Sequence, residues 1–179
     1  MMNYILFFVF SILLFSCANE SENEEGVTVK ETKVENDITD ACELIERQTI
    51  EDVFRTESEV SKQEPTSKQF PTCIYKWTAE KKGKKEIGSQ VVTYDQENTV
   101  MIVLGSTSAN IQQFERSTSV YKDAVEVDIA EKALWSDKMH QLTIMEKGNL
   151  IHINVEYFDA VDQQKAKSIE LAKIAIAHF

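Results

Sequence analysis

The stretch QLTIMEKGNLIHINVEYF, residues 141–158, decides the fold of this chain. Two runs of alternating apolar residues, QLTIM and LIHINVEYF, flank the four-residue connection EKGN, which contains a glycine. Alternation with period two on both sides of a short glycine-bearing connection predicts a β-hairpin. We expect the second strand to bury one face in the core, formed by Ile151, Ile153, Val155 and Tyr157.

Three more strands are predicted on the amino-terminal side of this hairpin. Residues 73–79 (CIYKWTA) alternate, residues 80–86 (EKKGKKE) predict a turn, and residues 87–95 (IGSQVVTYD) predict the return strand. Residues 99–105 (TVMIVLG) are apolar on both faces, which is typical of a central strand.

Helices are predicted after the capping residues Asp40, Thr49 and Asn110, and over residues 162–178, with a polar loop between residues 56 and 72. The apolar stripe expected on the last helix consists of Ala166, Ile169, Ala172 and Ile176. Antiparallel strands with helices at both ends indicate an α+β domain: an antiparallel sheet of about five strands with helices packed on it, including a C-terminal helix.

The amino terminus predicts export. Residues 4–15 (YILFFVFSILLF) contain one polar residue, Ser11, and fit the apolar core of a secretory signal. The run is shorter than the ~20 residues that span a bilayer. No Lys or Arg precedes it, unlike in most signal peptides. We therefore expect residues 1–16 to be a signal peptide, and the alternative is a buried core segment.

The border after this run, Leu14-Phe15-Ser16-Cys17, resembles a bacterial lipobox. The resemblance implies cleavage before Cys17, a diacylglycerol thioether on its sulfur and an acylated new amino terminus, which together anchor a protein firmly. Ala18, where some lipoproteins carry Asp, favours the outer membrane. The alternative is a secreted protein with an incidental cysteine.

Residues 17–40 predict a disordered acidic tether. Residues 18–40 hold eight acidic and two basic residues and no aromatic residue, so they cannot bury enough apolar area to offset their ordering entropy. The acidic residues after Cys17 also resemble surface-export signals of some lipoproteins. A plain spacer and an export signal both fit, so orientation toward the periplasm or the cell surface stays open.

Residues 41–179 predict a single α+β domain. They contain 17 basic and 22 acidic residues, a net charge of −5, without the concentrated basic face that nucleic-acid binding requires. Cys42 and Cys73 form an even pair in an exported protein, which favours a disulfide over a metal site or a reactive thiol.

Motifs for catalysis, metal binding or phosphate binding are not found in this sequence. GSTSAN (105–110) is interpreted as a loop and helix cap rather than an anion site, and His152 as a half-exposed strand residue rather than an acid or base. Trp77 and Trp135 are interpreted as packing residues rather than a sugar platform.

The one concentrated group of basic residues is Lys81, Lys82, Lys84 and Lys85, around Gly83. We expect these lysines at the tip of a mobile hairpin with their charges in water. Two interpretations are open: a solvated turn that aids solubility, or a contact with an anionic surface, such as lipid head groups or an acidic partner.

The order of CELIERQTIEDVF, CIYKW, AEKALWSDKMHQLTIMEKGNLIHINVEY and an Ala/Lys-rich final helix is similar to a group of small bacterial lipoproteins of unknown function. Their motif pairs a cysteine before a Leu-Ile step with a cysteine two residues before a tyrosine, here Cys42, Cys73 and Tyr75. Arg55-Thr56 stands where the group has a helix-ending glycine. The resemblance implies a PsbP-like domain and carries no catalytic residues.

Two functions follow as hypotheses. The first is a membrane-anchored outer-membrane lipoprotein whose domain is a non-catalytic module that binds an unknown protein or a small ligand, without cofactor, metal or nucleic acid. The alternative is an envelope hydrolase or transferase whose site the sequence does not reveal.

Overall fold

The computed structural model describes residues 38–64 and 70–179. The predicted signal peptide, Cys17 and the predicted tether as far as residue 37 lie outside the described residues. Residues 35–179 form one compact unit. Among the described residues, no helix is long and apolar enough to cross a membrane.

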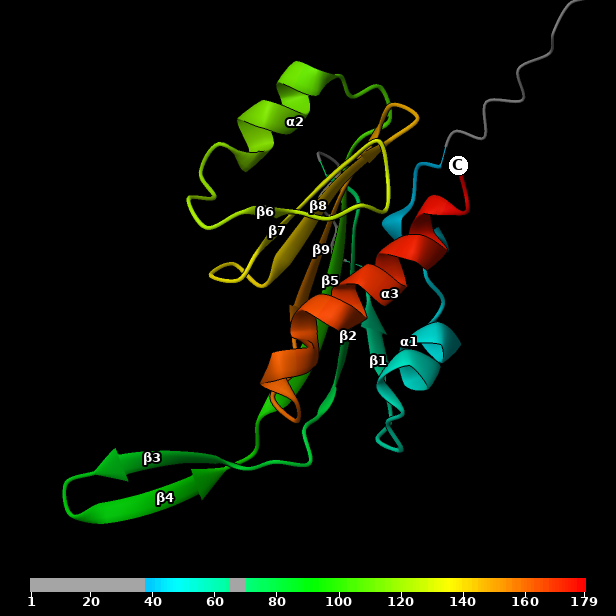
Figure 1. Cartoon of the computed structure of the whole chain (residues 1–179). Helices are drawn as coiled ribbons and strands as arrows, with labels where there is room; N and C mark the ends of the chain where they lie inside the picture. Colours follow the sequence, from blue (N-terminus) through cyan, green and yellow to red (C-terminus); the bar gives the residue numbers. More distant parts are fainter. Residues whose placement is uncertain (1–37, 65–69) are drawn as a thin grey trace, which may run out of the picture. The chain divides into compact units, whose positions relative to one another are not determined.

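The centre of this unit is a seven-stranded antiparallel sheet with the strand order β1-β2-β5-β9-β8-β7-β6 (Figure 1). Its strands are β1 (Ser61–Gln63), β2 (Thr72–Thr78), β5 (Glu97–Ser106), β6 (Val125–Glu126), β7 (Lys132–Ser136), β8 (Gln141–Glu146) and β9 (Asn149–Glu156). The α+β class and the antiparallel sheet are confirmed. The sheet has seven strands instead of about five. It includes β1, β6 and β7, which the sequence pattern does not predict, and it does not include residues 87–95.

The hairpin predicted at residues 141–158 is strands β8 and β9. They pair in register from Gln141 opposite Asn154 to Glu146 opposite Asn149. The two residues that join them, Lys147 and Gly148, both have positive φ, 46° and 77°. Two-residue connections with positive φ match the right-handed twist of the flanking strands, which fixes this register.

Strand β2 pairs with β5, from Thr72 opposite Val103 to Thr78 opposite Glu97. The prediction that it pairs with residues 87–95 is therefore wrong. The intervening chain forms a separate two-stranded sheet, β3 (Gly83–Ile87) and β4 (Gln90–Tyr94). In Figure 1 this β3–β4 hairpin extends away from the seven-stranded sheet.

The helices and 3-10 turns are η1 (Ala41–Glu43), α1 (Arg47–Phe54), α2 (Ile111–Thr118), η2 (Val161–Gln163) and α3 (Gln164–Ile176). Asp40 caps η1 as predicted, because its Oδ1 accepts a hydrogen bond of 2.8 Å from the Cys42 N–H. Asn110 caps α2 and forms a capping box with Gln113. Helix α1 begins earlier than predicted, with Glu46 instead of Thr49 as its N-cap residue.

The two faces of the sheet are covered differently. On one face, large buried side chains such as Tyr75, Trp135 and Ile153 pack with α1 and α3 in the main core. On the other face, Phe114 of α2 packs on Met145 and Leu150 in a smaller cluster. These clusters lie on opposite faces because neighbouring residues of a strand point in opposite directions.

The stripe predicted on α3 is partly wrong. Ala172 is buried as expected, but Ala166 is exposed. The buried positions of α3 are Gln164, Ser168, Leu171, Ala172 and Ala175. Apolar residues lie on several sides of this helix, so the sequence pattern alone left its rotation poorly defined.

Candidate functional site

The β3–β4 hairpin contributes little to the core: Gly83 is its one buried strand residue, and all other residues of β3 and β4 are exposed. Its register runs from Gly83 opposite Tyr94 to Ile87 opposite Gln90. Gly88, with φ of 63°, and Ser89 make the connection. A Gly-Ser pair between two runs of β-forming residues is a typical two-residue hairpin connection, and the sequence contains this signal.

One face of this hairpin carries three exposed apolar side chains. Alternation along the strands places Ile87, Val92 and Tyr94 on the same face as Lys85. The three apolar side chains are 59%, 42% and 48% exposed. We call this surface the apolar hairpin face. The opposite face carries Lys84, Glu86, Val91 and Thr93.

The ring of Tyr94 packs directly on the main chain of Gly83. A Cβ atom built at Gly83 would lie 2.4 Å from Cζ of the Tyr94 ring, which is far inside van der Waals contact. The ring can therefore lie across the strand only because this position lacks a side chain. Such aromatic covering of a strand glycine stabilises a two-stranded sheet that has no other layer.

The predicted lysine cluster is divided by this geometry. The predicted turn at residues 80–86 is wrong, because β3 begins within it and the tip lies at Gly88 and Ser89. Lys82 pairs with Asp95. Lys81 binds Asp159, donating its N–H to Oδ1 at 2.8 Å and its ammonium to the main-chain oxygen.

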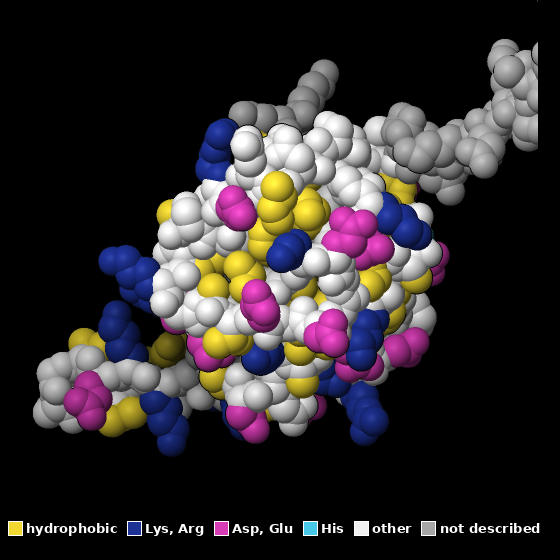
Figure 2. Space-filling model, turned by 45° about the horizontal axis from the view of Figure 1, so that its top comes forward, with side chains coloured by type: hydrophobic (Ala, Val, Ile, Leu, Met, Phe, Trp, Pro, Cys, Tyr) yellow, Lys and Arg dark blue, Asp and Glu magenta, His cyan; other side chains and the backbone are white. Residues whose placement is uncertain are grey.

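Lys84 and Lys85 lie on β3 itself, on opposite faces of the hairpin. Within residues 38–64 and 70–179 neither side chain makes an ion pair or a hydrogen bond. Figure 2 shows Lys and apolar side chains side by side on the hairpin, at its lower left. Two of the four lysines therefore have no partner among the described residues and can bind an anionic group.

The two ends of the hairpin, residues 79–81 and 96–98, are called its root, and polar contacts fix this root to the sheet. The fully buried Asn98 donates from Nδ2 to Asp159 Oδ2 at 2.6 Å, and its Oδ1 accepts from the Phe158 N–H at 2.8 Å. Ala79 N–H donates to the main-chain oxygen of Gln96 at 2.9 Å. The Ala79–Gln96 bond joins the two ends of the hairpin, and the bonds of Asn98, together with that of the Lys81 N–H to Asp159, join these ends to the chain after β9.

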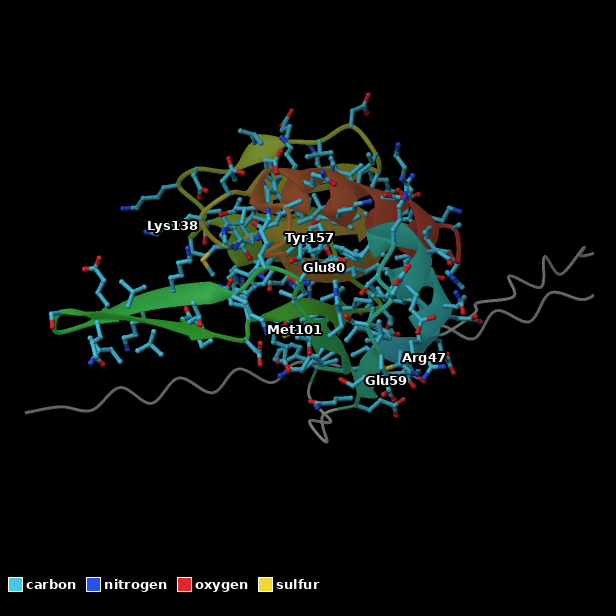
Figure 3. All side chains as sticks on the ribbon, turned by 90° about the horizontal axis from the view of Figure 1, so that it is seen from below. Arg47, Glu59, Glu80, Met101, Lys138 and Tyr157 are labelled. Carbon is cyan, nitrogen blue, oxygen red and sulfur yellow. A yellow bond between two sulfur atoms is a disulfide. The ribbon has the colours of Figure 1, made fainter. Side chains whose placement is uncertain are left out.

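Aromatic side chains pack beside this root. The ring centroids of Phe54 and Trp77 lie 4.8 Å apart, and those of Phe54 and Tyr157 lie 5.0 Å apart. Figure 3 shows Tyr157 and Glu80 near the place where the hairpin leaves the sheet. Burial raises the pKa of Tyr157, and the negative charges of Asp159 and Glu80 add to the shift.

A cavity of about 480 Å³ lies between α2 and the segment that leads into β7. Its lining includes apolar residues such as Phe114 and Leu134, together with four carboxylates and one lysine. The carboxylates are Glu115, Glu126, Asp128 and Glu131, and the lysine is Lys132. A rim of this charge repels anions and favours neutral or cationic groups.

His152 lies on the sheet face that carries α2. Its Nδ1 is 3.0 Å from Oγ1 of Thr143 and 3.1 Å from Nε2 of Gln141. Burial lowers its pKa to about 4, so the ring is neutral at pH 7. Because an amide nitrogen only donates, Nδ1 accepts and the ring proton is assigned to Nε2. His152 thus belongs to a hydrogen-bonded group within the sheet.

The other residues singled out in the sequence are structural. A disulfide links Cys42 in η1 to Cys73 in β2, as predicted. Trp77 and Trp135 are buried, with 3% and 1% of their surface exposed, which confirms a packing role. GSTSAN ends in the N-cap of α2, as expected of a loop cap.

Among the described residues, no group of three or more His, Cys, Asp or Glu side chains could hold a metal ion. Comparison of the chain with models of protein families, with curated proteins and with solved structures gives no match.

Proposed function

We propose that the protein is an exported lipoprotein, anchored in the outer membrane through a lipid on Cys17, with residues 17–40 as a tether. The apolar run at residues 4–15 and the lipobox-like border support export and lipidation. The disulfide between Cys42 and Cys73 agrees with an oxidising compartment outside the cytosol.

We further propose that the domain is a non-catalytic binding module whose contact element is the β3–β4 hairpin. The observation that carries this proposal is the apolar hairpin face. Apolar side chains gathered on one exposed surface commonly mark an interaction site. Isolated two-stranded hairpins are only marginally stable in water, so a hairpin held outside the core is better explained by contact than by stabilisation of the fold.

The anchoring half of the proposal is tested by expressing the full chain in a Gram-negative host and analysing the membrane fraction. We expect mass spectrometry to find Cys17 at the new amino terminus with a thioether-linked diacylglycerol and an acylated amine. A C17S variant should leave the membrane fraction. An unmodified Cys17, or cleavage at another residue, would refute anchoring.

The binding half is tested by replacing the hairpin residues Lys82–Asp95 with a two-residue turn. The domain should keep its thermal unfolding midpoint within a few degrees, because the hairpin adds little to the core. Loss of cooperative unfolding in this variant would show that the hairpin is a structural element and would contradict the proposed role.

A further inference from the structure

We propose that the apolar hairpin face docks on the surface of an anionic lipid bilayer. Ile87, Val92 and Tyr94 would lie at the boundary between head groups and acyl chains. Lys85, on the same face, would reach lipid phosphates, and Lys84, on the opposite face, would add attraction from a longer distance. The inference rests on the proposed function for one point: the lipid on Cys17 keeps the hairpin close to a bilayer and so raises its effective concentration there.

The composition of the hairpin fits a membrane interface. Tyrosine is enriched at the membrane–water interface, because its ring is apolar and its hydroxyl forms hydrogen bonds with water or head groups. Lysine can lay its aliphatic stem on apolar surface and keep its ammonium among the head groups. Tyr94, Lys85, Val92 and Ile87 follow one another along one face of the paired strands, so a single face carries both properties.

Charge selects an anionic surface. Residues 41–179 carry 22 acidic and 17 basic residues, so most of the domain is repelled by anionic lipid. Lys84 and Lys85 lie on β3 and are unpaired within the described parts of the chain. Figure 2 shows the hairpin, with Lys side chains on it, extending beyond the body of the domain. Net repulsion of the rest of the domain, together with attraction at the hairpin, would orient the domain with the hairpin toward the bilayer.

The root contacts give this arrangement a defined geometry. Asn98 and Asp159 hold both ends of the hairpin, and Lys81 and Lys82 are already occupied by Asp159 and Asp95. Docking therefore uses the apolar hairpin face with Lys85, and Lys84 on the opposite face adds attraction, without rearrangement of the sheet. This division distinguishes the inference from a general attraction of all four lysines.

The first experiment measures binding of residues 35–179, the compact unit without the lipid, to vesicles. Vesicles of phosphatidylcholine alone are compared with vesicles that also contain phosphatidylglycerol. We expect binding to the mixed vesicles only, and a K84Q/K85Q variant should bind about 25-fold more weakly, at roughly fivefold per lysine. The matched control K132Q/K173Q removes the same charge from β7 and α3 and should bind like the wild type.

The apolar contribution has a matched pair within the hairpin. I87T/V92T changes the apolar hairpin face and should weaken binding roughly tenfold, because each change removes apolar surface from the contact. V91T makes the same kind of change on the opposite face and should bind like the wild type. Circular dichroism and the thermal midpoint of every variant verify that the fold is kept.

The second experiment uses the full lipidated chain in bilayers. The indole of a Y94W variant should be quenched by brominated lipids when the bilayer is anionic, whereas the buried Trp77 and Trp135 should stay protected. Failure of this quenching with Cys17 lipidated would refute the docking alone. Binding of the unlipidated unit with Cys17 unmodified in cells would refute the anchoring alone.

Three outcomes would overturn the inference. The first is equal binding of the wild type and K84Q/K85Q, or binding by neither. The second is equal loss of binding in I87T/V92T and V91T. The third is hairpin-dependent self-association in sedimentation without lipid, which would assign the apolar hairpin face to a second copy of the chain.

Discussion

Reduction of the Cys42–Cys73 disulfide is expected to lower the free energy of unfolding by about 3.7 kcal/mol. The bond closes a loop over a sequence separation of 31 residues, and a cross-link of this length removes that much conformational entropy from the unfolded chain. A domain of this size is typically stable by 5–15 kcal/mol, so the loss is about a quarter to three quarters of the total.

The folded state should change little when this bond is broken. Leu44 and Ile45 beside it are buried in the core, and the Tyr75 hydroxyl donates a hydrogen bond to the main-chain oxygen of Ile45. These contacts hold the η1 segment on β2 without the cross-link. The effect of reduction should therefore come mainly from the unfolded state.

The assay is urea unfolding followed by the fluorescence of the two buried tryptophans. With a slope of about 1–3 kcal/mol per molar urea, the midpoint should fall by roughly 1.2–3.7 M on reduction. A C42A/C73A variant is the control: its midpoint should be low and should not respond to reductant. An unchanged midpoint for the reduced wild type would refute the stabilising role of the disulfide.

Three further predictions concern single side chains. The pKa of His152 is lowered by burial from 6.5 to about 4, so the free energy of unfolding should be unaffected by this group above pH 6.5 and fall by about 3 kcal/mol as the pH drops toward 4. An H152Q variant with the same pH dependence would contradict this. N98A should lower the free energy of unfolding by about 1–3 kcal/mol, because it leaves the Phe158 N–H unpaired; a thermal shift below one degree would argue against the root contacts. G83V should displace the ring of Tyr94 and change the near-ultraviolet circular dichroism, while the midpoint stays within a few degrees; an unchanged spectrum would exclude the packing described at this glycine.

The β8–β9 hairpin could be predicted because its alternation is strict and its connection is short and contains glycine. The partner of β2 could not be predicted from local pattern. Residues 87–95 are close in sequence and rich in β-forming residues, so the local pattern predicts them as the return strand, whereas the sheet pairs β2 with the more distant β5. Non-local pairing is decided by burial across the sheet, which a local pattern does not contain.

The candidate site was predicted only in part. The lysines at residues 81–85 stand out in the sequence by their charge, but the apolar hairpin face is missed because residues 87–95 are predicted as the return strand beside residues 73–79, whereas Ile87, Val92 and Tyr94 lie exposed. Periodicity shows which residues share a face and does not show whether another layer covers that face. The same limit explains the misplaced stripe of α3.

Hydrogen exchange of the full lipidated protein in bilayers tests the central claim most directly. An uncovered two-stranded hairpin is marginally stable and should exchange its amides quickly. On bilayers that contain phosphatidylglycerol, exchange at residues 84–94 should slow relative to phosphatidylcholine alone, while β8 and β9 should stay unchanged. Equal exchange of residues 84–94 in both bilayers, or protection confined to α2 and its cavity, would contradict the account.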